Sequence, residues 1–282
     1  MLNRARKGWK LTQHSLRILH TQKRLLILPL CGSIAAFILL AISLVLLWHI
    51  ETHVLTTQHV FTFKNTLMFL LFFIDLFFFN WILFFSNAAM VASVTHYLKT
   101  NQLSLRYGLH TAFSRFPAIF KWTLFITTIG IIIRIFQSNS RKFTGIPALL
   151  MGLSWSVISY FVIPVLLFEN VSPLRNIKRS AQLAKQTWGP FLTANFSVGL
   201  LFVLARLSIF VPLIIGLYWG GTDQIIGLIV TLVLFIILTI LIIATNNILH
   251  SALYLFAVEG NSFGPFKKES IRTAFQTRNP SH

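Results

Sequence analysis

Six apolar runs dominate this sequence, and each is long enough to cross a lipid bilayer as a helix. A helix needs about 20 apolar residues to span the hydrocarbon core. The runs cover residues 25–48, 66–95, 118–136, 146–168, 191–218 and 225–258. A membrane β-barrel would instead show short segments of alternating hydrophobicity, and none is present. We therefore predict an all-α, polytopic membrane protein with six transmembrane helices, in which residues 1–282 form a single integral membrane domain.

The composition agrees with a surface that faces lipid. Of the 282 residues, 55% are hydrophobic and 11% are charged, and the mean hydropathy is +0.75. Soluble domains carry about 25% charged residues, so this chain lacks the charge for a solvated surface. The chain is basic, but no soluble domain is available to present a groove-binding element. We therefore expect no nucleic-acid partner.

The basic residues lie at the ends of alternate runs. The chain has 24 Lys and Arg against six Asp and Glu. Nineteen of these bases lie before the first run, within 96–121, within 169–190 or after the sixth run, whereas the other loops hold four. Lys and Arg accumulate in the cytoplasmic loops of membrane proteins. We therefore predict a multi-pass protein of the cell inner membrane with both termini in the cytoplasm.

Three of the predicted cytoplasmic segments resemble one another. They read TNQLSLRYGLHTAFSR, ENVSPLRNIKRSAQLAK and EGNSFGPFKKESIRTAFQ. The match between the first and third extends backwards, because Asn87 and Asn101 have the same spacing as Asn247 and Asn261. This pattern predicts a repeated unit of two spans and one amphipathic helix.

Two of the repeated segments show a clear helical period. Their apolar positions are Leu105, Leu109, Ala112, Phe113 and Phe116 in the first, and Leu174, Ile177, Ala181 and Ala184 in the second. Each set fits one face of a helix. Four bases lie off the second face: Arg175, Lys178, Arg179 and Lys185. We expect basic amphipathic helices on the cytoplasmic face, with these four bases contacting anionic lipid headgroups. Short helical linkers between spans are the alternative.

Polar residues within the runs are the candidates for a site in the membrane. They include Thr127, Thr128, Ser154, Ser156, Ser159, Asn246, Asn247 and His250. Such groups usually form hydrogen bonds between helices, at about 0.6–2 kcal/mol each. A path for a substrate is the alternative interpretation.

No sequence motif indicates an enzyme. The chain has no G-x-S-x-G, Walker A or H-E-x-x-H motif. His49 and His53 have the spacing of metal ligands, but no second cluster completes a site. Glu169 and Glu259 occupy equivalent positions at the ends of their runs, and we interpret each as balancing the bases that follow. We therefore expect no catalytic residue, no bound metal and no cofactor.

One acid, Asp75, interrupts the run LFFIDLFFF at residues 71–79. A charge at the bilayer centre costs about 2.5–3.5 kcal/mol on insertion scales and normally faces a partner. Arg206, in the fifth run, lies within about 5 Å of the same depth if each residue adds 1.5 Å. We predict that Asp75 and Arg206 form an intramembrane charged pair. A protonated Asp75, or one bonded to threonines of residues 118–136, is the alternative.

Four blocks of the sequence resemble a known family. They read RKGWKLTQHSLRIL, FFSNAAMVASV, PVLLFENVSPLRNIKRS and KQTWG. They are similar to a group of bacterial six-span inner-membrane proteins described as a domain of unknown function. A looser similarity links the chain to the membrane domain attached to some glycerophosphodiester phosphodiesterases, whose catalytic domain this sequence lacks. The resemblance implies a fold and a membrane location, and no reaction.

These features favour a non-enzymatic, membrane-organising or accessory protein that contacts anionic lipid on the cytoplasmic side. The alternative is a transporter or channel for a small solute or a lipid. Internal repeats and polar groups near the membrane midplane are typical of transporters.

Overall fold

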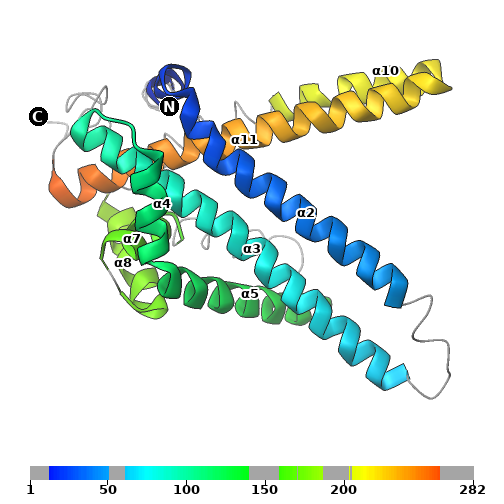
Figure 1. Ribbon diagram of the computed structural model, residues 1–282, viewed down its shortest axis with the longest axis horizontal. Helices are drawn as coiled ribbons and strands as arrows, with labels where there is room; N and C mark the ends of the chain where they lie inside the picture. Colours follow the sequence, from blue (N-terminus) through cyan, green and yellow to red (C-terminus); the bar gives the residue numbers. More distant parts are fainter. Residues whose placement is uncertain are drawn as a thin grey trace, which may run out of the picture.

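The computed structural model describes residues 13–50, 61–139, 159–169, 171–186, 203 and 205–260. Within these residues every regular element is a helix (Figure 1). Four helices are long and apolar enough to cross a membrane, namely α2 (Ile27–His49), extended by η1 (Lys23–Leu26), α3 (Phe61–Thr100), α5 (Phe116–Asn139) and α11 (Thr222–Glu259). The prediction of an all-α protein with membrane-spanning helices is therefore confirmed at this level.

The other two predicted spans fall largely outside the described residues. Of residues 146–168, the described helix is α7 (Val162–Phe168). Of residues 191–218, the described part contributes the apolar helical stretch Ala205–Trp219, which includes α10 (Val211–Trp219). Residues 1–12, His53, Ser154, Ser156 and the third repeated segment beyond residue 260 also lie outside the described residues. The count of six spans and the repeat therefore stay predictions.

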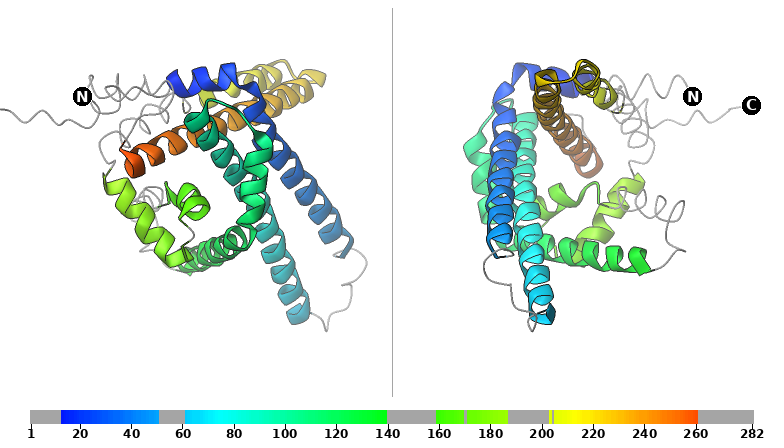
Figure 2. Two further views of the ribbon diagram at one scale, coloured as in Figure 1. Left: turned by 60° about the vertical axis from the view of Figure 1, so that its left-hand side comes forward. Right: turned by 90° about the vertical axis from the view of Figure 1, so that its right-hand side faces the viewer.

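Helices α2 and α3 run side by side (Figures 1 and 2). Gly32 of α2 faces Ser86 of α3 so closely that a Cβ atom at position 32 would collide with the serine side chain. The Ser86 hydroxyl also donates a hydrogen bond to the Leu28 carbonyl oxygen at 2.5 Å. Small residues let membrane helices approach closely, and van der Waals packing then holds them together.

The short helix α4 (Leu105–Ser114) folds back onto the end of α3. Asn101 turns the chain in a left-handed conformation with φ of 58°. Ser104 then caps α4, because its Oγ accepts a hydrogen bond from the Tyr107 N–H at 3.1 Å.

Glycine and alanine form the packed face of α4. Gly108 and Ala112 are buried, whereas Leu109 and Phe113 are exposed. A Cβ atom on Gly108 would collide with Ser93 and with the backbone of α3. Of the apolar face predicted for this segment, Ala112 packs against α3, whereas Leu109 and Phe113 are exposed, because the contact at Gly108 is too close for long side chains. Both leave apolar surface on α4, and the Phe113 ring also packs edge to face on Phe85 of α3, with centroids 4.9 Å apart.

Helix α8 (Pro173–Gln186) packs against α7 through polar side chains. Asn176 donates from Nδ2 to the Val162 carbonyl oxygen at 3.2 Å, and Ser180 Oγ accepts from the Phe161 N–H at 3.0 Å. Asn176 and Ser180 are fully buried, whereas Leu174 is 65% exposed. The predicted apolar face of Leu174, Ile177, Ala181 and Ala184 is therefore not the face that packs on α7. Asn176 and Ser180 take its place because they satisfy backbone groups at the start of α7.

Glycines also build the hairpin of α10 and α11. The turn consists of Gly220 and Gly221, with φ of 78° and 61°, which residues with a side chain rarely adopt. Gly216 and Gly227 then face each other closely, because a Cβ on either would collide with the opposing backbone. Figure 1 shows α10 lying along the N-terminal part of α11.

The buried core lies at one end of the helices. It contains residues 88–94 of α3, most of α7 and residues 248–255 of α11. Residues 13–21 form a further helix, which adds Ile18 and Leu19 to this core. The far ends of α2 and the N-terminal half of α11 expose their apolar side chains. We call the packed end of the bundle the core end; it is the end predicted to face the cytoplasm.

Candidate functional site

Asp75 has a partner other than the predicted one. Ser43 of α2 donates its hydroxyl hydrogen to Asp75 Oδ1, at 2.6 Å. Arg206 is exposed, and the ion pairs of the described residues do not join it to Asp75. Asp75 is therefore bonded to Ser43, because α2 packs beside this part of α3. The pair of Asp75 with Arg206 stays a prediction.

Helices α3 and α11 meet in parallel at a constant offset of 160 residues. Asn247 Nδ2 donates to Asn87 Oδ1 at 2.8 Å, and Ser251 Oγ donates to the Val91 carbonyl oxygen at 3.4 Å. The spacing of the asparagines in the sequence has the same offset. Positions that match in the sequence thus face each other in space.

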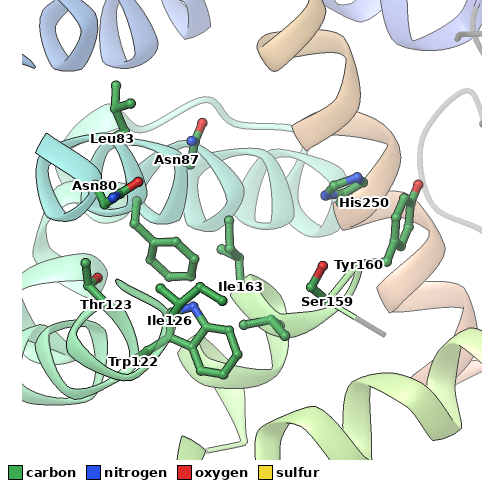
Figure 3. Close-up of a pocket in the computed structure, with 12 residues that line it drawn as sticks. Asn80, Leu83, Asn87, Trp122, Thr123, Ile126, Ser159, Tyr160, Ile163 and His250 are labelled. Carbon is green, nitrogen blue, oxygen red and sulfur yellow. The ribbon is translucent and has the colours of Figure 1, made fainter. Parts of the chain in front are cut away.

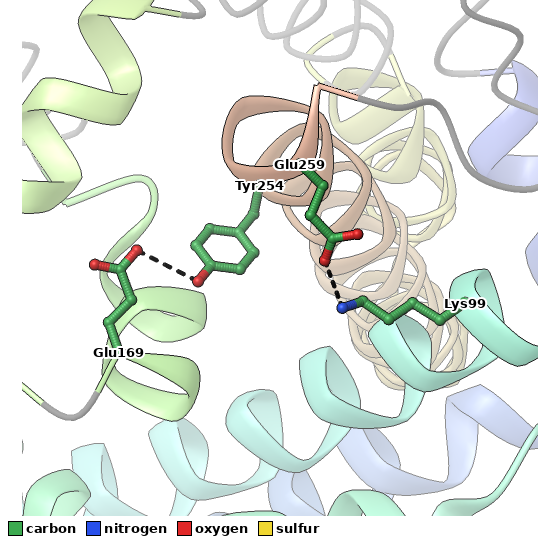
Figure 4. A network of polar contacts seen from close by, with 4 residues as sticks. All are labelled: Lys99, Glu169, Tyr254 and Glu259. Carbon is green, nitrogen blue, oxygen red and sulfur yellow. Dashed lines mark hydrogen bonds and ion pairs between the residues drawn. The ribbon is translucent and has the colours of Figure 1, made fainter.

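The core end also carries a network of charged groups (Figure 4). Lys99 Nζ lies 2.5 Å from Glu259 Oε1 and joins the end of α3 to the end of α11. Glu169, which follows α7, accepts from Arg179 Nε of α8 at 2.7 Å and from the Tyr254 hydroxyl of α11 at 3.4 Å. Glu169 thus binds a base that follows it, as predicted, whereas Glu259 binds Lys99, which lies 160 residues before it in the sequence. Each glutamate connects separate elements.

The four bases predicted to contact lipid divide into two groups. Arg175, Lys178 and Lys185 are exposed. Arg179 is partly buried, with 36% of its side chain exposed, and is held by Glu169. Three of the bases therefore lie on the outer face of α8. The fourth, Arg179, attaches α8 to Glu169.

A polar hollow of about 340 Å³ lies between α3, α5, the start of α7 and α11 (Figure 3). Its polar lining residues are Asn80, Asn87, Thr123, Ser159, Tyr160 and His250, and its apolar or aromatic ones include Leu83, Phe84, Trp122, Ile126 and Ile163. The volume falls within the range of small-molecule sites, about 300–1,000 Å³. Among the lining residues that the structure describes, none is Asp, Glu, Lys or Arg. The described lining therefore combines polar groups with apolar and aromatic ones and holds no carboxylate, ammonium or guanidinium group.

Three side chains present polar atoms to this hollow. His250 Nδ1 is buried and has no hydrogen-bond partner in the described part of the chain, while its ring packs on Tyr160 with centroids 3.9 Å apart. Asn80 donates from Nδ2 to the Leu76 carbonyl oxygen at 2.8 Å, which leaves its Oδ1 as an acceptor. Asn87 uses its Oδ1 for Asn247, which leaves its Nδ2 as a donor.

A second hollow of about 260 Å³ continues from the first along the groove between α3 and α5. The two share Asn80 and Ile126, and the second reaches Thr127 and Arg134 towards the far end of α5. Thr127 Oγ1 is buried without a hydrogen-bond partner in the described structure. The two hollows therefore adjoin each other in the groove between α3 and α5.

The sequence identified part of this site. Ser159, His250 and Thr127 were predicted from their position within apolar runs. Asn80, Trp122 and Tyr160 were missed as lining residues. The spacing of Asn80 and Asn87, two helical turns apart on α3, was a signal that could have located the first face of the hollow.

The comparisons with known proteins give a family without a function. Residues 62–264 match the model of DUF6159, a family of unknown function. The predicted resemblance to a family of unknown function is therefore confirmed, while the likeness to the phosphodiesterase membrane domain stays a prediction. No curated protein matches the chain.

Proposed function

Since the chain belongs to the DUF6159 family, which has no assigned function, we propose from its geometry that it organises or assists other membrane components by contacting anionic lipid. In this proposal the protein is non-enzymatic and lies in the inner membrane with both termini in the cytoplasm. The contact is made by α8 at the core end.

The outer face of α8 supports this proposal. At 100° per residue, Arg175, Lys178 and Lys185 fall on one side of the helix, opposite the buried Asn176 and Ser180. Each base close to an anionic surface contributes about 1 kcal/mol. Leu174 is exposed beside these bases, so an apolar side chain is available to enter the headgroup region.

The attachment of α8 supports the same proposal. Arg179 binds Glu169 and so fixes α8 to the end of α7. The charge of Arg179 is therefore neutralised within the protein and not by lipid. Because α8 is already fixed in place, its remaining bases can bind lipid headgroups without a large loss of chain entropy.

The test uses the full chain in nanodiscs with spin-labelled phosphatidylglycerol or phosphatidylcholine. Replacing Arg175, Lys178 and Lys185 together by Gln is expected to reduce the preference for phosphatidylglycerol. Arg134→Gln, which removes a base near the far end of α5, is the matched control and is expected to leave the preference unchanged. Equal association of the unaltered chain with both lipids would contradict the proposal.

A second candidate function, passage of a small solute or lipid, is favoured by the polar hollow. Two hollows that share Asn80 and Ile126 lie along α3 and α5, and Arg134 lines the second. In proteoliposomes, uptake of an uncharged solute such as glycerol is expected to exceed that of protein-free vesicles. His250→Leu is expected to slow this uptake. Absence of uptake would exclude this candidate and leave the lipid contact of α8 unaffected.

A further inference from the structure

We infer that the polar hollow between α3, α5 and α11 binds an uncharged, hydroxyl-bearing group. A binding site requires neither transport nor lipid contact by α8, so this inference goes beyond both proposed functions. It rests on the polar atoms that face the hollow.

The available polar atoms differ in kind. Asn80 Oδ1 is an acceptor, Asn87 Nδ2 is a donor, and His250 Nδ1 takes either role according to the tautomer. A hydroxyl group both donates and accepts, so a ligand with hydroxyls satisfies such a mixed set. Figure 3 shows that these side chains enter from different elements, with His250 and Tyr160 on one flank of the hollow.

Charge restricts the ligand further. Among the described residues that line the hollow none is Asp, Glu, Lys or Arg, so a bound anion or cation would lack a counter-ion from them at low dielectric. Burying an unpaired charge costs far more than burying a hydrogen-bonded hydroxyl. An uncharged ligand is therefore favoured over a phosphate or an ammonium group.

The buried His250 Nδ1, which has no hydrogen-bond partner among the described residues, and the aromatic walls point to an occupant. A buried polar atom without a partner is costly, and in a membrane span bulk water does not satisfy it. The hollow far exceeds the roughly 10–15 Å³ that one water requires. Phe84 and Trp122 offer ring surfaces to the carbon framework of a ligand.

Two sources could supply such a group, namely the headgroup of an uncharged lipid such as diacylglycerol or a free polyol such as glycerol. The test is native mass spectrometry of the full chain, counting retained dioleoylglycerol relative to dioleoylphosphatidylcholine, which has no hydroxyl. Glycerol is added as a competitor. Retention of dioleoylglycerol that glycerol does not displace identifies the lipid source. Displacement, or binding of glycerol alone, identifies the free polyol.

Variants decide whether the hollow is responsible. His250→Leu and Asn80→Leu are each expected to weaken binding roughly 5- to 10-fold, the effect of one lost hydrogen bond. Thr128→Val is the matched control, because Thr128 lies on α5 outside the hollow and bonds its own helix at Leu124. Melting temperatures measured alongside show which variants fold, and Asn80→Leu keeps the test open if His250→Leu does not fold. Retention of neither ligand, or equal binding by both folded variants, overturns the inference and leaves the hollow to water.

Discussion

Lys99 Nζ and Glu259 Oε1 lie 2.5 Å apart although 160 residues separate them in the chain. The same separation recurs between Asn87 and Asn247, which are also hydrogen-bonded. The ion pair therefore closes a parallel contact between α3 and α11 at the core end. The side chains of Lys99 and Glu259 are 44% and 35% exposed. This exposure determines how much stability the protein should lose when the ion pair is removed.

The Lys99–Glu259 pair is expected to contribute little stability. Exposed ion pairs are typically worth about 0.2–1 kcal/mol, because water screens the charges and two long side chains lose freedom. Glu259→Gln should therefore lower the free energy of unfolding in detergent by less than about 1 kcal/mol. A loss of several kcal/mol, measured by thermal denaturation, would contradict this prediction.

Glu169→Gln is expected to cost more than Glu259→Gln. The carboxylate of Glu169 is less exposed, at 22% of its side chain, and it binds both Arg179 and Tyr254. Hydrogen bonds to charged groups are worth about 1.5–3 kcal/mol. Comparing the two glutamine variants under the same denaturation conditions tests the order, and a smaller loss for Glu169→Gln would refute it.

Gly108→Ala is expected to destabilise the packing of α4 on α3. The new Cβ would collide with the Ala89 carbonyl oxygen and with Ser93, and overpacking of this kind costs about 1–3 kcal/mol. Gly130→Ala is the matched control, because a Cβ at position 130 meets no atom within 4 Å. That variant should be neutral or more stable by up to about 1 kcal/mol, through helix propensity. Equal melting temperatures for both variants would show that the contact at Gly108 is loose.

Ser43→Ala and Asp75→Asn are expected to show energetic coupling. Their side chains share a hydrogen bond of 2.6 Å, and contacting residues couple by about 0.5–3 kcal/mol in double-mutant cycles. The measurement is thermal stability of the two single variants and the double variant. A second cycle with Asp75→Asn and Arg206→Gln tests the ion pair predicted from depth. Coupling of that size in the second cycle would establish the pair, and strictly additive losses would exclude it.

Residues 178 and 218 are expected to lie on opposite sides of the membrane. Lys178 is an exposed base of α8, and Tyr218 is exposed at the end of α10. With Cys31, the only cysteine, replaced by Ser, single cysteines at positions 178 and 218 are labelled in spheroplasts with an impermeant maleimide. Position 218 should react from outside, and position 178 only after permeabilisation. Labelling of position 178 in sealed spheroplasts would reverse the predicted orientation.

The sequence predicted those helices that form because their own residues are apolar over a long stretch. Helices α2, α3, α5 and α11 follow the predicted runs 25–48, 66–95, 118–136 and 225–258 within a few residues. A long apolar stretch is stable in lipid only when its backbone groups bond internally, and that requirement makes it a helix wherever it packs.

The packed faces of α4 and α8 could not be predicted in the same way. The apolar period assigned Leu109 and Leu174 to an apolar helix face without showing what that face contacts, and both residues are exposed. In a membrane protein an apolar side chain is stable against lipid, so hydrophobicity alone does not identify the face that packs. The inward positions instead went to residues that fit a close contact or satisfy a backbone group, such as Gly108 and Asn176.

The sequence by itself determined the class of this protein, its long helices and the location of its charges, because apolar length and polar spacing are local properties of the chain. Only the tertiary structure decided that Asp75 is bonded to Ser43 and that Asn80 and His250 line one hollow. These relationships join residues far apart in sequence. They depend on which helices approach closely enough for direct contact. Small residues such as Gly32 and Ser86 allow that close approach, because their side chains leave room for the neighbouring helix.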